Sequence, residues 1–137
     1  MSFDPYIHFQ GNCREAMAAY QMVFGGELSI MGYDQMPDPP PEMKGSPLVM
    51  HSMLRVGNRS LMASDFPPGH GGEPQQAVTI SHEAGSDAEA RGLFAALAKD
   101  GTVMMDYQPT FWSDGFGMLR DRFGTHWMIS APWRQPG

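Results

Sequence analysis

Five histidines are the residues of this sequence best suited to proton transfer or metal binding, because an imidazole titrates near neutral pH and ligates metals. His8 and His82 occupy similar apolar stretches, and strand alternation favours paired, half-buried positions for both. The apolar neighbours of His51 indicate a core or groove histidine rather than a ligand. His126 has strand parity that points it into a pocket, so it is the best candidate for a titratable pocket group. His70, in a Gly- and Pro-rich stretch, is expected to be solvated.

No nucleophile pattern accompanies these histidines. Cys13 falls in the first turn of a predicted helix, where the helix dipole stabilises a thiolate. No histidine is near it in sequence, and a free cysteine is most often simply buried, so an inert thiol is the expectation. The sequence contains no GxSxG, HExxH, P-loop or CxxC motif, and no catalytic residue is assigned from it.

Charge and composition narrow the class of protein. The formal net charge is −6 and no basic cluster occurs, which argues against nucleic-acid and membrane-surface partners. The first residues lack the features of a signal peptide, and no apolar run is long enough to span a membrane. A single cysteine cannot form an internal disulfide. These features predict a cytoplasmic protein.

The positions of apolar residues and turn residues predict short strands and helices in a repeated order. Asn12, followed by Glu15, predicts a capped helix that ends at Gly25, and Ser86 or Asp87 is expected to cap a second helix. The expected strands are 6–10, 28–33, 48–56, 60–64, 77–82, 102–107, 116–120 and 125–130, with helices after 12 and over 88–99. The proline-rich segment 34–47 is expected to be a loop rather than a strand.

An internal repeat is the strongest signal in the chain. A shift of 74 residues lays Tyr6 on Ile80 and His8 on His82, and shifts of 66 and 65 align the later strands. The repeat predicts an α+β fold of two tandem βαβββ modules, with curved mixed sheets and helices on the outer face. The expected bounds are module 1 at about 4–65, a linker at 66–76 and module 2 at 77–131, within one domain of residues 1–137. The concave faces would enclose a small-molecule cleft.

Three segments strengthen this interpretation: GNCREAMAAY, HSMLRVGNRSLMASD and TFWSDGFGMLRDRFGTHWMIS. They resemble the PhnB-like branch of the vicinal-oxygen-chelate superfamily, which includes glyoxalases, bleomycin-resistance proteins and dioxygenases. The resemblance implies paired βαβββ modules and a homodimer. Some PhnB-like chains carry a name from a ubiquinone-pathway methyltransferase, but no Gly-rich loop for S-adenosylmethionine is visible here.

The resemblance also implies four metal ligands, one from the first and fourth strands of each module. Those positions fall on Pro5, Met62, Thr79 and Met128. Proline has no donor, threonine is a weak ligand alone, and thioethers suit soft copper(I) rather than zinc, nickel, magnesium or iron(II). No superfamily-type metal and no cofactor are therefore expected.

Two functions remain open from the sequence. The first is binding of a small molecule in a metal-free cleft, and the residues expected to line it are Ile7, Phe9, Met62, Thr79, Trp112, His126 and Met128. The second is a lyase, isomerase or transferase with an unrecognised metal or a metal-free acid/base pair, such as His126 with Asp65 or Asp114. A cleft filled by its own Met and aromatic side chains, binding nothing, is a third possibility.

Two other residues have structural and functional interpretations. Asp65, at the end of the fourth strand, is expected either to cap a backbone segment or to bind a ligand. Trp112 is expected either to anchor its loop or to cover a ligand pocket. Trp127, which alternates away from Met128, is expected to pack on the helix.

Overall fold

The computed structural model describes residues 3–67, 69 and 71–134 of the 137-residue chain. The chain divides between Gln75 and Gln76 into two compact units. The first unit is named unit 1 below and the second unit 2. His70, expected to be solvated, lies outside the described residues.

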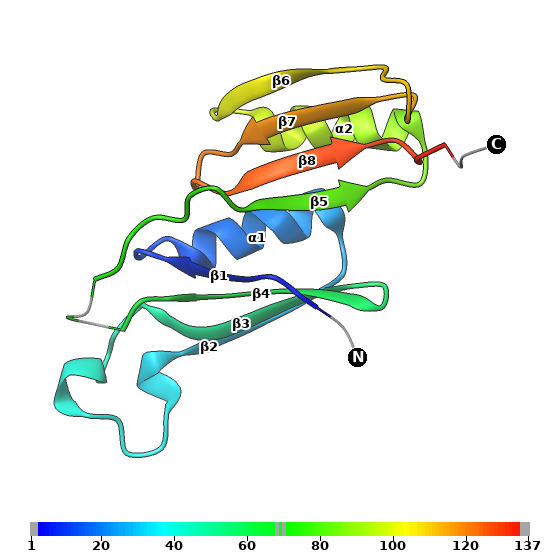
Figure 1. Ribbon diagram of the computed structural model, residues 1–137. Coiled ribbons are helices and arrows are strands. Elements are labelled where there is room, and N and C mark those ends of the chain that lie inside the picture. Colours follow the sequence, from blue (N-terminus) through cyan, green and yellow to red (C-terminus); the bar gives the residue numbers. More distant parts are fainter. Residues whose placement is uncertain (1–2, 68, 70, 135–137) are drawn as a thin grey trace. The chain divides into compact units, whose positions relative to one another are not determined.

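Unit 1 consists of one mixed sheet and one α-helix (Figure 1). Strand β1 runs parallel to β4, while β4, β3 and β2 pair antiparallel in the order β1-β4-β3-β2. The elements are β1 (Tyr6–Phe9), α1 (Cys13–Phe24), β2 (Glu27–Gly32), the 3-10 turns η1 (Tyr33–Gln35) and η2 (Pro41–Met43), β3 (Val49–Val56) and β4 (Arg59–Asp65).

Unit 2 repeats this topology with the strand order β5-β8-β7-β6. Its elements are β5 (Thr79–Glu83), α2 (Asp87–Ala98), β6 (Thr102–Gln108), β7 (Phe116–Arg120) and β8 (His126–Ser130). Strand β5 is parallel to β8 and the remaining pairs are antiparallel. The predicted α+β fold of two βαβββ modules is confirmed, and segment 34–47 contains 3-10 turns but no strand.

Each helix covers one face of its own sheet. Helix α1 packs on β2, β3 and β4, and α2 packs on β6, β7 and β8. The fully buried large side chains between each helix and its own sheet include Met17, Tyr20, Leu54, Leu119 and Ile129. Trp127 is 2% exposed, which confirms that it packs into the core. The opposite face of each sheet carries the partly exposed side chains and is called the open face below.

The two helices begin in different ways. Ser86 caps α2 as predicted, because its side chain accepts a hydrogen bond from Glu89 N at 3.1 Å. The capping box predicted for Asn12 and Glu15 is wrong, since the Asn12 side chain makes no cap hydrogen bond. The carboxylate of Asp65 reaches across from β4 instead and accepts hydrogen bonds from Gly11 N and Cys13 N.

The sheet register corrects the repeat in one respect. Tyr6 pairs with Met62, and Ser81 pairs with Met128. Since Met62 and Met128 are equivalent, the equivalent of Tyr6 is Ser81, a shift of 75 rather than 74. The helices, which begin at Cys13 and Asp87, keep the shift of 74. The connection from strand to helix is therefore one residue shorter in unit 2.

This one-residue difference separates His8 from His82, which are not equivalent. A shift of one residue moves a side chain to the other face of its strand. His8 is exposed on the open face with Tyr6. His82 is half-buried on the helix-covered side, and burial lowers its pKa while Glu89 of α2 acts in the opposite direction. The predicted equivalence of the two histidines is wrong.

Two glycines show the repeat at the level of packing. A Cβ on Gly26 would overlap the carbonyl oxygen of Arg55, and one on Gly101 would overlap the carbonyl oxygen of Arg120. Gly26 directly precedes β2 and Gly101 directly precedes β6. Both strands lie at the edge of their sheet. At these two points the backbones of neighbouring strands approach too closely for any side chain.

Replacing Gly26 by alanine is expected to destabilise unit 1 by about 2–4 kcal/mol, because the new Cβ meets backbone that cannot rotate away and φ is +90°. Gly25→Ala is the matched control. Its φ is also positive, at 75°, but a Cβ there has no neighbour within 4 Å, so it measures backbone strain alone. Urea denaturation followed by circular dichroism gives both values. Equal losses for the two variants would contradict the packing argument.

Among the described residues, no helix is both long enough and apolar enough to cross a membrane.

Candidate binding site

The open face of the unit 1 sheet carries the densest group of side chains capable of binding. Directly paired residues in neighbouring strands point to the same face. The pairs Tyr6 with Met62 and His8 with Ser64 place β1 and β4 side chains there. Met62 also pairs with Met53 of β3, which brings His51, two residues away on the same strand, to this face.

Four rings form a connected row on this face, named the ring row below: Phe66, His8, Tyr6 and His51. Their neighbouring centroids are 5.4, 5.1 and 5.7 Å apart in that order. The interplanar angles are 23°, 36° and 28°, so the two outer pairs are stacked and the central pair, His8 and Tyr6, is tilted. Such rings present flat apolar surface with polar atoms at their edges.

Hydrogen bonds fix three of these rings. The Tyr6 hydroxyl lies 3.1 Å from Nδ1 of His51, and Ser64 Oγ lies 3.4 Å from Nδ1 of His8. Tyr6 is 40% exposed, whereas Ser64 is buried beneath the row. The contact with buried Ser64 thus holds the row from beneath, and the contact between Tyr6 and His51 holds it from within. The solvent-facing side of the rings remains accessible.

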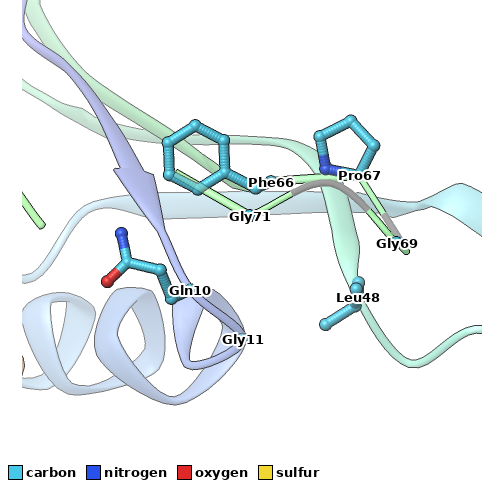
Figure 2. Close-up of a pocket in the computed structure, with 7 residues that line it drawn as sticks. All are labelled: Gln10, Gly11, Leu48, Phe66, Pro67, Gly69 and Gly71. Atoms are coloured by element: carbon cyan, nitrogen blue, oxygen red, sulfur yellow. The ribbon is translucent and has the colours of Figure 1, made fainter. Parts of the chain in front are cut away.

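Phe66 links the ring row to a shallow pocket of about 270 Å³ (Figure 2). Its ring packs so closely on Gly72 that any Cβ there would overlap it. The lining residues are Gln10, Gly11, Leu48, Phe66, Pro67, Gly69 and Gly71. The pocket is mainly apolar, and it adjoins the end of the row at which Phe66 stacks on His8.

The open face of the unit 2 sheet is of a different kind. Met105, Met118 and Met128 pair in register across β6, β7 and β8, and Ser81 continues this line on β5. Thr79 pairs with His126 one step along. This face offers flexible thioethers and hydroxyls, with no stack of rings at the positions equivalent to Tyr6 and His8.

The predicted cleft residues separate into two groups in the structure. Met62, Thr79, His126 and Met128 are partly exposed and lie on open faces. Trp112 is partly exposed and makes edge-to-face contacts with Phe111 and Phe116. These five remain predicted binding residues.

Ile7 and Phe9 form the second group and require a correction. They are 5% and 3% exposed and alternate with Tyr6 and His8, so they belong to the helix-covered core. Apolar character suggested a cleft, but the same character favours the core when a helix covers that face. Tyr6, His8 and Phe66 take their place on the open face. The parity of Tyr6 with His8 was the signal in the sequence that placed these two on one face, and no such signal marks Phe66.

Both carboxylates suggested by the sequence as partners of His126 are engaged by other groups. The Asp65 carboxylate accepts hydrogen bonds from the backbone of Gly11, Cys13 and Val49, so the capping interpretation is confirmed. Asp114 pairs with the guanidinium of Arg134. The structure brings Tyr6 and His51 together instead, a contact between residues 45 positions apart in sequence that no local pattern reveals.

The donor set does not suit the divalent metal that the fold superfamily implies. The expected positions are Pro5, Met62, Thr79 and Met128. The residues paired with the two methionines are Tyr6 and Ser81, so the side chains on offer are thioethers, hydroxyls and a phenol. Zinc, nickel, magnesium and iron(II) require nitrogen, thiolate or carboxylate donors. Across 3–67, 69 and 71–134, no group of three or more His, Cys, Asp or Glu side chains is arranged to hold a metal ion.

Cys13 is fully buried, with Sγ 3.6 Å from Ser52 Oγ. Burial raises the pKa of the thiol to about 11, and the hydrogen bond with Ser52 only partly offsets this. The desolvation of the thiolate outweighs the helix dipole, so the expectation of an inert thiol agrees with the structure.

The native thiol is expected to react with an aromatic disulfide reagent at pH 8 at least about 100-fold more slowly than the unfolded chain. The pKa of about 11 lies two units above the ordinary thiol value of 9.0, which lowers the thiolate fraction by that factor before the limited access of the reagent is considered. Absorbance of the released thiolate, with and without urea, measures both rates. Comparable rates would contradict the buried, protonated thiol.

Comparisons with known proteins agree with the fold described above. The sequence from residue 1 to 130 matches the family described as 3-demethylubiquinone-9 3-methyltransferase. The chain belongs to this family. Protein YjdN of Escherichia coli is 32% identical over 99% of this chain and 99% of its own length. An uncharacterized protein of Mycobacterium bovis, Mb0911c, is 30% identical over 64% of this chain and 61% of its own length.

Solved structures of PhnB-like proteins and their superfamily share the fold. Protein PA1353 from Pseudomonas aeruginosa is 41% identical, covers 96% of this chain and 97% of its own, and has a TM-score of 0.87. The PhnB protein from Bacillus cereus is 22% identical, with coverage of 96% and 100% and a TM-score of 0.72. The fosfomycin resistance protein FosX from Mesorhizobium loti, at 9% identity, has a TM-score of 0.58 and shares the fold alone. The predicted membership of the PhnB-like branch of the vicinal-oxygen-chelate superfamily is confirmed.

Proposed function

We propose that this PhnB-like protein binds a small molecule without a divalent metal, and that the open face of the unit 1 sheet is its contact surface. The observation that carries the proposal is the ring row of Phe66, His8, Tyr6 and His51. Adjacent aromatic and imidazole rings offer apolar contact area with little conformational freedom to lose, because each has only two side-chain torsions.

The surroundings of the row support a binding surface of adaptable shape. Met62 lies on the same face and is paired with Tyr6, and Met53 is next to it. Methionine side chains adjust to irregular ligands through three rotatable bonds and a polarizable sulfur. His51 supplies a hydrogen-bonding group at a defined place beside this apolar surface, which is the usual composition of a small-molecule site.

The proposal does not include the methyl transfer in the family's description, because no Gly-rich loop for S-adenosylmethionine is visible in the sequence. It includes a homodimer, which rests on resemblance to the superfamily. Sedimentation velocity at micromolar concentration tests the homodimer separately: a mass of two chains supports it, and a 15.1 kDa species contradicts it.

Binding is tested with a panel of small aromatic compounds and protein purified without a metal-affinity tag. We expect thermal stabilisation by some of them and shifts in the ring signals of His8 and Tyr6 in NMR spectra. Tyr6→Ala should abolish both effects. Met22→Ala, which alters an 89% exposed methionine on α1, is the matched control and should change neither.

Elemental analysis of the same preparation separates the alternatives. Less than a tenth of an equivalent of zinc, nickel, manganese or iron, together with unchanged binding after chelation, supports the metal-free proposal. A stoichiometric divalent metal would instead support the lyase, isomerase or transferase. Binding that shifts no residue of the open face would remove the proposed surface.

A further inference from the structure

The hydrogen bond between Tyr6 and His51 determines which tautomer the neutral imidazole of His51 takes. A phenol hydroxyl is a good donor and the basic nitrogen of a neutral imidazole a good acceptor. With the Tyr6 hydroxyl 3.1 Å from His51 Nδ1, this chemistry favours the phenol as donor and Nδ1 as acceptor. The proton of the neutral imidazole then resides on Nε2.

The Nε2–H group produced in this way makes no hydrogen bond with any other described residue. His51 is only partly buried, and its ring lies at the end of the ring row. A donor held in a fixed direction beside a flat apolar surface selects for an acceptor on the ligand. A donor on the ligand at this point would face another donor.

The charges on this face are compatible with a neutral or anionic acceptor. The charged residues that the register places on the open face near His51 are Arg55 and Glu27, which pair with each other across β3 and β2. Arg55 lies four residues along the strand from His51, about 13 Å at ordinary strand rise. Tyr6 and His8, the titratable groups of β1, lie nearer, while β4 contributes Met62 and Ser64.

We propose that the ligand is a planar aromatic molecule with an acceptor oxygen, a carbonyl or a carboxylate, bound with its ring on the ring row and its oxygen on His51 Nε2–H. This inference rests on the proposed function and specifies its ligand class. Tyr6 has two roles in it: its ring is contact surface, and its hydroxyl is a positioning group that fixes the His51 tautomer. His51 supplies the hydrogen bond to the ligand.

The test uses 2-naphthoate as probe and 2-naphthylmethylammonium, of the same ring size with a donor in place of the acceptor, as counter-probe. We expect 2-naphthoate to bind more tightly than the ammonium compound to the full chain. Long-range ¹H–¹⁵N NMR spectra should show His51 as the Nε2–H tautomer before and after addition of 2-naphthoate, with the Nε2 signal shifted by binding.

Tyr6→Phe separates the two roles of the tyrosine, because it keeps the ring and removes the hydroxyl. We expect a mixture of His51 tautomers and an affinity for 2-naphthoate that falls about three- to tenfold, the range of one net hydrogen bond. Tyr107→Phe is the matched control. It removes a hydroxyl that donates to Asp87 Oδ1 and should leave both the tautomer and the affinity unchanged.

The outcomes distinguish this inference from the proposed function. If 2-naphthoate shifts His8 and Tyr6 but binds Tyr6→Phe as tightly as the unaltered chain, the hydrogen-bond assignment is overturned while the binding surface stands. Equal or tighter binding of the ammonium probe overturns the ligand class. If neither probe nor any compound of the aromatic panel shifts an open-face residue, both proposals fail.

Discussion

Replacing Asp65 by alanine is expected to lower the free energy of unfolding of unit 1 by about 3–5 kcal/mol. The Asp65 carboxylate is 2% exposed. One oxygen accepts from Gly11 N at 2.8 Å and Cys13 N at 3.0 Å, and the other from Val49 N at 2.9 Å. Its removal leaves buried backbone donors unsatisfied at the start of α1 and of β3 together.

Urea denaturation followed by far-UV circular dichroism measures this loss. Glu15→Ala is the informative control, because the sequence predicts a capping role for Glu15 and the structure gives that role to Asp65. Glu15 is exposed on α1, so its replacement should cost less than about 1 kcal/mol, the scale of a helix-dipole interaction. A larger loss for Glu15→Ala than for Asp65→Ala would reverse the assignment.

Asp121→Ala is the corresponding prediction for unit 2, with an expected loss of about 3–4 kcal/mol. Asp121 is 5% exposed. One carboxylate oxygen accepts from Phe123 N and Thr125 N, and the other from Trp127 Nε1, each at 2.9 Å. The side chain therefore shapes the β7–β8 turn and orients the buried indole.

Tryptophan fluorescence during urea denaturation reports on this region, and the midpoint should fall for Asp121→Ala. Asp121→Asn should also be destabilising. Its amide NH₂ would replace the oxygen that accepts from Trp127, so that two hydrogen-bond donors would face each other. Asp114→Ala, which breaks an exposed ion pair with Arg134, should cost less than about 1 kcal/mol. An unchanged midpoint for Asp121→Ala would show that the turn does not depend on its carboxylate.

The sequence was sufficient to predict the fold because the relevant signals are local and duplicated. Strand alternation, helix spacing and turn residues recur in both halves, and each gives the same answer as the topology. The cap at Ser86 was predictable since a short-range hydrogen bond forms it. The cap supplied by Asp65 was only one of two interpretations of that residue. Its carboxylate lies 54 and 52 residues along the chain from Gly11 and Cys13, the residues whose N–H groups donate to it.

The candidate site was less predictable, for a geometric reason. Its members become neighbours only through the parallel pairing of β1 with β4 and the antiparallel pairing of β4 with β3. A repeat aligned by letters carries no information on a one-residue change in loop length. It therefore placed His8 and His82 at equivalent positions, while apolar character alone assigned Ile7 and Phe9 to the wrong face. Sheet register, which depends on hydrogen bonds between distant segments, resolves both points.

The shorter connection between β5 and α2 has a consequence for stoichiometry. A duplicated fold suggests two equivalent binding places in each chain. Where unit 1 has Tyr6 and His8, however, unit 2 has Ser81 and Glu83 in the same register. A hydroxyl and a carboxylate offer no plane for an aromatic ring, and the carboxylate repels an anionic oxygen, so saturation is expected at one ligand molecule for each polypeptide.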